Sequence, residues 1–189
     1  VREMREINKE GIDIVLSLDL SLSMLQEDFN PNRLEVSKKV LVDFVKNRPN
    51  DRISLVIFGG EAYTKVPLTL DHSMLIDIIQ RLSVDDITTN DRTAIGMGIG
   101  VALNRIKESP SKSKVVILLT DGENNSGSMS PMAAANIAKK LDIKVYTRDS
   151  EGNGVIYSQS YTTDGNQTVF SLGTIPSTNE AVFVKVNNI

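Results

Sequence analysis

The chain has 189 residues, which suits one domain with a sizeable core and is too short for two domains of ordinary size. Its 21 basic and 24 acidic residues give a formal net charge of -3, and no basic stripe with interleaved aromatic residues occurs, so nucleic acid is not an expected partner. The absence of cysteine excludes disulfides, thiol catalysis and cysteine-bound zinc. No apolar run approaches the ~20 residues that span a bilayer, so we expect any membrane attachment to come from anchors outside this sequence.

Strand and helix patterns alternate through most of the chain. The expected order is a strand at 12–18, a helix from 34 to about 48, strands at 52–58 and 62–66, helices at 71–82 and from 95 to about 106, a strand at 114–120, a helix at 131–141 and a strand at 143–147. This alternation predicts an α/β fold of the Rossmann-like, doubly wound type, with a mostly parallel central sheet and helices on both faces. The strand at 62–66 follows a Gly-Gly turn and ends at Pro67, so we expect a short antiparallel edge strand there.

The sequence after residue 147 has a different texture. Runs rich in Thr, Ser, Tyr and Val at 155–161 and 167–172 flank Thr163-Asp164-Gly165-Asn166, which is a strong turn signal, and 181–186 has a further strand pattern. We therefore expect one domain over residues 1–189, with its core at 10–147 and a divergent, β-hairpin-rich C-terminal segment at 148–189.

Oxygen-bearing side chains follow two of the predicted buried strands. Asp19, Ser21 and Ser23 come at the end of the first strand, and their alternation by two in an extended loop would point them the same way. Asp121 ends the strand at 114–120. Open α/β sheets bind ligands at the carboxyl ends of their strands, and this mixture of carboxylates and hydroxyls suits Mg²⁺ or Mn²⁺ better than zinc or copper.

These motifs resemble those of a known family. Asp19-Leu20-Ser21-Leu22-Ser23 is similar to the DxSxS motif of the von Willebrand factor A-type (VWA) domain, Thr93 stands where that family places its threonine, and Leu119-Thr120-Asp121-Gly122 matches its acid-bearing strand end. Within the family, the runs at 12–16, 31–35, 93–96 and 121–127 most resemble bacterial membrane-anchored aerotolerance (Bat-type) proteins.

The resemblance implies a metal-ion-dependent adhesion site (MIDAS). Ser21, Ser23 and Thr93 would touch the cation, and Asp19 and Asp121 would act directly or through water. An acidic residue of a partner protein would complete the metal shell, which is the chemistry of a noncatalytic protein-interaction domain. The Bat-type resemblance further implies a cell-envelope protein whose domain faces the periplasm, tethered to the inner membrane by segments outside this sequence.

Two positions depart from the family pattern. Leu22 stands where many relatives carry glycine, and a positive φ there would cost leucine roughly 1 to 2 kcal/mol. Arg92 stands where the Bat-type branch often has glycine, and we expect it to point outward because an inward cation would oppose metal binding.

Other functions are also compatible with these residues. A metal-assisted hydrolase would need a general base, for which the loop acids Asp28, Asp91 and Glu123 are the candidates. His72, the single histidine, follows the helix cap Asp71 and is expected to be a solvated first-turn residue. A third alternative is a structural domain with a vestigial metal site.

Overall fold

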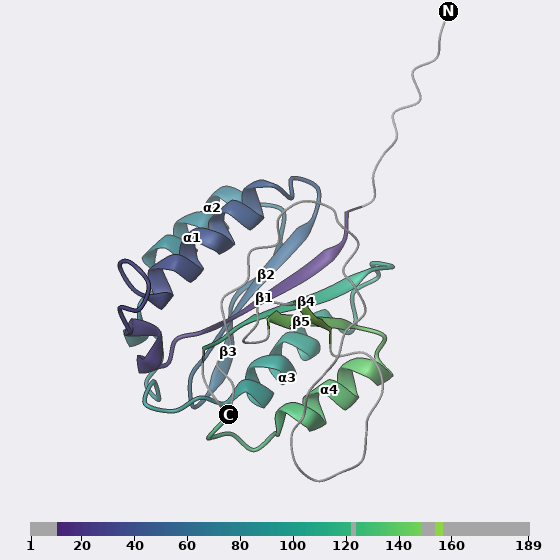
Figure 1. Cartoon of the computed structure of the whole chain (residues 1–189). Coiled ribbons are helices and arrows are strands. Elements are labelled where there is room, and N and C mark those ends of the chain that lie inside the picture. Colours follow the sequence, from purple (N-terminus) through teal and green to yellow (C-terminus); the bar gives the residue numbers. More distant parts are fainter. Residues whose placement is uncertain (1–10, 122–123, 149–153, 157–189) are drawn as a thin grey trace, which may run out of the picture.

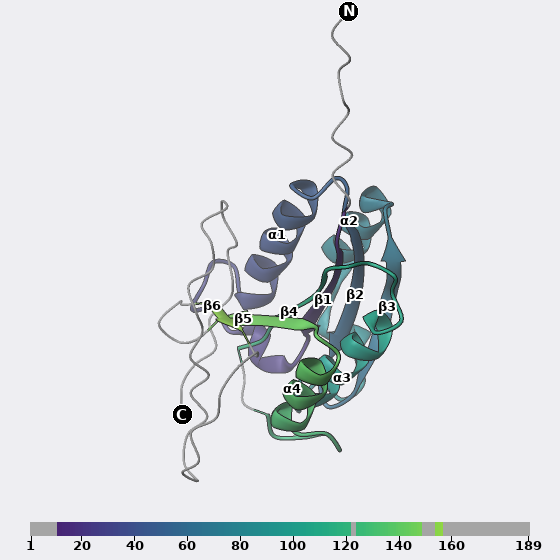
Figure 2. The same ribbon diagram turned by 90° about the vertical axis from the view of Figure 1, so that its right-hand side faces the viewer.

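The computed structural model describes residues 11–121, 124–148 and 154–156. They contain a six-stranded sheet in the order β3-β2-β1-β4-β5-β6, which Figure 2 shows from β6 across to β3. The strands are β1 (Asp13–Asp19), β2 (Arg52–Phe58), β3 (Ala62–Thr69), β4 (Lys114–Leu119), β5 (Lys144–Arg148) and β6 (Gly154–Ile156). β1 pairs in parallel with β2 and β4, and β4 pairs in parallel with β5, so the predicted mostly parallel sheet is confirmed.

Antiparallel strands form the two edges of this sheet. β3 is the predicted antiparallel edge strand, but it continues past Pro67 to Thr69 because an edge position leaves room for a residue without an N–H. β6 adds a second antiparallel pair at the opposite edge. Apart from β6, the predicted C-terminal hairpin at 155–172 and the strand at 181–186 lie outside the described residues.

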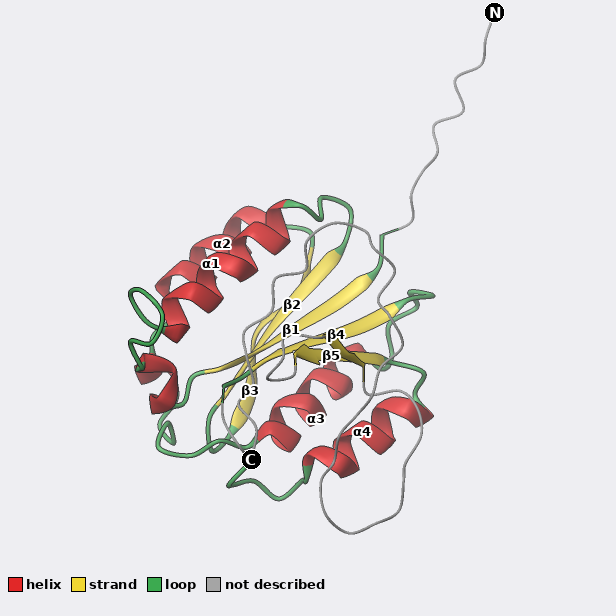
Figure 3. Cartoon of the chain, viewed as in Figure 1, coloured by secondary structure: helices red, strands yellow, loops and turns green. Residues whose placement is uncertain are grey.

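Helices cover both faces of the sheet, as the alternating patterns predicted. α1 (Arg33–Lys46) and α2 (His72–Arg81) lie on one face, and α3 (Ile95–Ile106) and α4 (Pro131–Lys140) lie on the other (Figures 1 and 3). Two 3₁₀ helices, η1 (Leu22–Leu25) and η2 (Val84–Asp86), lie in the connections. None of the described helices is long and apolar enough to cross a membrane.

The central strand β1 joins the two hydrophobic cores. All seven of its residues are buried, and they alternate between the faces of the sheet. Ile14, Leu16 and Leu18 pack in the core beneath α1 and α2, whereas Val15 packs in the core beneath α3 and α4. Burial on both faces explains why this strand is a nearly continuous apolar run, and it fixes the position of the strand's last residue, Asp19.

The first turn of α3 packs closely against the segment that leads into α4. A Cβ atom at Gly96 would lie 2.0 Å from the main-chain oxygen of Met129, whereas at Gly100 the nearest atoms are the Met129 Sδ at 3.0 Å and Cε at 3.3 Å. A main-chain oxygen cannot rotate away, but the end of a methionine side chain can. The two glycines therefore differ in how much space they require.

Gly96→Ala is expected to lower the free energy of unfolding by about 2 kcal/mol, because overpacking outweighs the roughly 1 kcal/mol that alanine gains in helix propensity. Gly100→Ala in the same helix is the matched control and should change it by less than about 1 kcal/mol. Urea denaturation of both variants measures the difference. Equal stabilities of the two variants would contradict this account of the α3 contact.

Candidate metal centre

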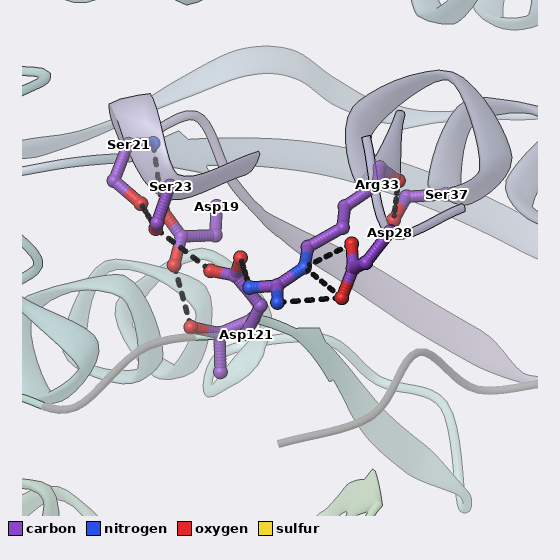
Figure 4. Close-up of polar contacts among 8 residues, drawn as sticks. Asp19, Ser21, Ser23, Asp28, Arg33, Ser37 and Asp121 are labelled. Atoms are coloured by element: carbon purple, nitrogen blue, oxygen red, sulfur yellow. Dashed lines mark hydrogen bonds and ion pairs between the residues drawn. The ribbon is translucent and has the colours of Figure 1, made fainter. Parts of the chain in front are cut away.

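The parallel pairing of β1 with β4 brings the two predicted acids to the edge of the sheet that the carboxyl ends of its parallel strands form. Leu18 is in register with Leu119, so Asp19, the last residue of β1, and Asp121, two residues after β4, lie at the carboxyl ends of neighbouring central strands. Figure 4 shows Asp19, Ser21, Ser23 and Asp121 grouped at this edge. The structure thus gathers four of the five predicted site residues through side-chain and main-chain hydrogen bonds.

Asp19 is a fully buried carboxylate with hydrogen bonds to both oxygens. Its Oδ1 atom accepts the Ser21 N–H at 2.8 Å, and its Oδ2 atom accepts the Thr120 hydroxyl at 2.5 Å. Burial raises the pKa of Asp19 to about 6, although these hydrogen bonds act in the opposite direction. The environment therefore disfavours the charge of Asp19, and a nearby cation would favour it.

The hydroxyl groups of Ser21 and Ser23 lead from the Asp19 side of the site to Asp121. The Ser21 and Ser23 Oγ atoms are 2.9 Å apart, and the Ser23 hydroxyl donates to Asp121 Oδ1 at 2.9 Å (Figure 4). The predicted extended loop is wrong, because Ser21 is the N-cap of η1 and Ser23 lies within that helix. The buried side chain of Met24 anchors the turn, which brings the hydroxyls together without strict alternation.

The two departures from the family pattern cause no conflict at this edge. Among the described residues, the only non-glycine with a positive φ is Asp142, so Leu22 does not carry the strain that a left-handed conformation would impose. Leu22 instead begins η1 with its side chain half exposed. Arg92 is exposed on its loop, as predicted.

The loop that carries Thr93 lies between the other two site loops. The Leu22 N–H donates to the Asn90 carbonyl at 2.7 Å, which joins this loop to η1. On the other side, the Thr93 N–H donates to Asn125 Oδ1 at 2.8 Å, and the Asn125 N–H donates to the Thr93 carbonyl at 3.0 Å. Thr93 is buried. Asn125 is therefore a positioning residue for this loop, although nothing in the sequence pattern distinguished it from its neighbours.

Arg33 is a second residue that the sequence analysis missed. It is the first residue of α1, and its Nη1 atom donates to Asp121 Oδ2. Its Nε and Nη2 atoms donate to the carboxylate of Asp28 at 2.7 to 3.1 Å. Figure 4 shows the guanidinium between the two acids. Arg33 lies in the run at 31–35 that resembles Bat-type proteins, but that resemblance assigned it no contact with the site.

Neither Asp28 nor His72 is placed to act as a general base beside these loops. The hydrogen bonds from Arg33 hold the pKa of Asp28 below its usual value, so Asp28 is a poor base. Asp91 is exposed, and Glu123 lies outside the described residues. The His72 Nε2 atom is 2.8 Å from the carbonyl of Asp51, which precedes β2. The histidine therefore lies at the amino-terminal ends of the parallel strands, away from the acids at their carboxyl ends.

The donor set at this edge fits a hard divalent cation. Within residues 11–121, 124–148 and 154–156 there is no group of three or more His, Cys, Asp or Glu side chains that could hold a metal. The predicted centre has only two acids, and its other ligands are hydroxyls, so it contains oxygen donors alone. Such a set suits Mg²⁺ or Mn²⁺, and the disfavoured charge of Asp19 would be stabilised by either ion.

Comparison with known proteins agrees with this geometry. A sequence profile of the von Willebrand factor type A domain matches residues 14–123. The chain belongs to the von Willebrand factor type A domain family. This VWA assignment confirms the resemblance that the strand-end motifs predicted, and the matched range contains Asp19, Ser21, Ser23, Thr93 and Asp121.

Relatives of this VWA domain include bacterial and animal proteins. An uncharacterised protein of Borreliella burgdorferi is 36% identical over 138 residues, which cover 72% of this chain but only 40% of the relative. An aerotolerance-related membrane protein from Bacteroides fragilis is 28% identical, with a TM-score of 0.66, and the match covers 77% of this chain and 81% of that one. Proximal thread matrix protein 1 from the mussel byssus, with a zinc-occupied MIDAS motif, is 25% identical, with a TM-score of 0.63. That match covers 74% of this chain and 35% of the mussel protein.

The charge of Asp19 is expected to destabilise the metal-free domain above its pKa. Because burial raises that pKa from 3.8 to about 6, the destabilisation is absent below about pH 3.8 and complete above about pH 6. In EDTA, the unfolding free energy of Asp19→Asn minus that of the wild type should therefore rise between pH 4 and pH 7.5, by about 1–3 kcal/mol. Urea denaturation at both pH values measures it, and a difference independent of pH would contradict the assignment.

Proposed function

We propose that this VWA domain is a noncatalytic, metal-dependent protein-interaction module of a cell-envelope protein. Ser21, Ser23 and Thr93 hold Mg²⁺ or Mn²⁺ through their hydroxyls, and Asp19 and Asp121 orient its waters. When bound, the ion supplies an electrophilic position that a carboxylate of a partner protein can enter. The observation that carries the proposal is the gathering of these side chains: Asp19 accepts the Ser21 main-chain N–H, and the Ser21 hydroxyl contacts the Ser23 hydroxyl, which donates to Asp121.

The neutral hydroxyls are what favour binding of an anionic partner. Two carboxylates in direct contact with a divalent ion would cancel its charge, whereas hydroxyls leave that charge in place. Asp121 is also partly neutralised by Arg33, which further preserves the attraction for a partner's acid. The mussel protein with zinc in its MIDAS supports metal binding by this family, while the oxygen-only donors of this chain favour a harder ion.

The surface next to the serines is suited to a protein partner. Leu22, Leu25 and Phe29 are 47%, 42% and 41% exposed, and all three lie within seven residues of Ser23. In a 3₁₀ helix, residues three apart lie on one face, so Leu22 and Leu25 of η1 share a face. A partner acid flanked by apolar side chains would bury these residues while its carboxylate approached the ion.

Two residues that could have acted as the base of a hydrolase, Asp28 and His72, are engaged elsewhere. A hydrolase needs a base within reach of the activated water, but Asp28 is paired with Arg33 and His72 is at the amino-terminal ends of the parallel strands. A binding role requires no base. The vestigial-site alternative makes a different prediction, because it expects no response to metal.

We also propose a periplasmic location for the domain, anchored by segments beyond this sequence. The similarity to an aerotolerance-related membrane protein supports it, and the chain spans only 40% of the length of the Borreliella relative. Protease added to spheroplasts that contain the full-length protein should degrade the domain, and protection would place it in the cytoplasm instead.

Metal is expected to stabilise the wild-type domain and not Asp19→Ala. At 100 times its dissociation constant, Mg²⁺ or Mn²⁺ should add roughly 2.7 kcal/mol to the free energy of unfolding, and loss of the buried carboxylate should remove that gain. Urea denaturation with and without metal measures it. Asp91→Ala removes the same charge from an exposed position on a neighbouring loop and should keep the gain. If neither metal changed the free energy of unfolding of the wild type, the vestigial-site alternative would be favoured.

The same proteins test the interaction itself. Capture of a partner from a membrane extract should require metal and fail both in EDTA and with Asp19→Ala. Leu25→Ser should weaken capture while the stabilisation by metal stays unchanged, because Leu25 is exposed beside the site rather than part of it. Full-strength capture in EDTA would overturn the metal-bridged mechanism, and metal-dependent turnover of phosphate or peptide substrates would support the hydrolase.

A further inference from the structure

The Arg33 side chain is a built-in cation at the proposed metal centre. The side chain is 9% exposed, and it joins Asp121, which is 1% exposed, to Asp28, which is 47% exposed. Asp121 consequently has a different partner on each oxygen, with the Ser23 hydroxyl on Oδ1 and the Arg33 guanidinium on Oδ2. One face of this carboxylate is directed to the serines and the other to a positive charge.

The position of Arg33 in α1 is electrostatically unfavourable in the absence of these acids. As the first residue of the helix, it lies where the helix dipole disfavours a cation. Burial adds a desolvation cost, which only close anionic partners can offset. Two carboxylates around one guanidinium provide that compensation. The arrangement therefore depends on Asp121 being available to Arg33.

A divalent ion would draw on the same carboxylate. Both cations favour the charge of Asp121, but they repel each other across it, so each weakens the attraction of the other. Asp28 limits the repulsion, because it binds the guanidinium through two of its nitrogens and offers a counter-charge on the solvent side. The balance between Asp28 and Asp121 therefore sets how strongly Arg33 opposes a second cation.

We propose that Arg33 is an internal cation that competes with the divalent ion for Asp121 and thereby sets the metal affinity of the site. The inference rests on the proposed metal-binding function. Asp28 acts in the opposite sense, since it draws the guanidinium charge toward solvent. The affinity of the centre is then determined by a residue that binds no metal itself.

The test is a calorimetric titration of the 189-residue chain with Mn²⁺ at fixed ionic strength, which gives the dissociation constant. Arg33→Gln removes the competing charge and should lower the dissociation constant at least fivefold. Its main-chain contacts do not require the guanidinium, because the Arg33 N–H donates to the Gln26 carbonyl and the Ser37 hydroxyl donates to the Arg33 carbonyl. The metal-free variant should melt at a lower temperature than the wild type, and the shift in melting temperature caused by Mn²⁺ should be larger.

Asp28→Asn separates competition from a purely structural role. This variant keeps Arg33 but removes its outer counter-charge, so the guanidinium should act more strongly on Asp121 and the dissociation constant for Mn²⁺ should rise at least twofold. Competition thus predicts opposite changes in the two variants. If Arg33 only held the loops in place, both variants would weaken metal binding.

The outcomes are distinct for the two proposals. Tighter binding by Arg33→Gln and weaker binding by Asp28→Asn would support the inference. Detectable Mn²⁺ binding by Arg33→Gln, with none by the wild type or by Asp28→Asn, would support it most strongly. A wild type that binds Mn²⁺ while Arg33→Gln binds it equally or less well would overturn the inference and leave the metal site intact. Absence of binding by the wild type and both variants would overturn the metal site, and the role of Arg33 with it.

Discussion

The parallel pairing of β1 with β4 is the constraint on which the candidate site depends. Parallel neighbours end at the same edge of a sheet, and the register of Leu18 with Leu119 brings Thr120 within hydrogen-bonding distance of Asp19. A slip of one residue in either strand would turn its side chains to the opposite core and move the strand-end acid to the other face. The apolar packing of both faces therefore positions the carboxylates, although none of the packed residues is part of the site.

The two acids at this edge are compensated in different ways. Asp19 receives hydrogen bonds from neutral donors only, so burial dominates and its pKa rises. Asp121 instead has a cation, Arg33, on one oxygen. The charge of Asp19 would therefore be stabilised by an external cation, whereas the charge of Asp121 is already partly neutralised by Arg33. Two aspartates of similar burial can therefore contribute unequally to the electrostatics of one site.

Features that depend on local sequence patterns were predictable, whereas individual side-chain contacts between residues far apart in the sequence were not. The elements and the meeting of Asp19 with Asp121 were predictable, because apolar periodicity is local and parallel strands share an edge. The contact of Arg33 with Asp121 was not, because the two residues are 88 positions apart and a first-turn arginine ordinarily lies in solvent. The 3₁₀ turn at Ser23 was also missed, since its placement depends on the buried Met24 rather than on any repeat.

Hydrogen bonds between the site loops determine what remains to be ordered when a ligand binds. Main-chain bonds from Leu22 to Asn90 and from Asn125 to Thr93, with a further bond from the Thr93 N–H to the Asn125 side chain, hold the three loops against one another. The serine hydroxyls already lie together, so binding would cost little conformational entropy in the backbone. The remaining variable is charge: Arg33 of α1 pairs directly with Asp121, and Asp28 of the preceding loop pairs with Arg33. In such a centre, affinity can change through the substitution of one charged residue while the loops and the sheet beneath them stay as they are.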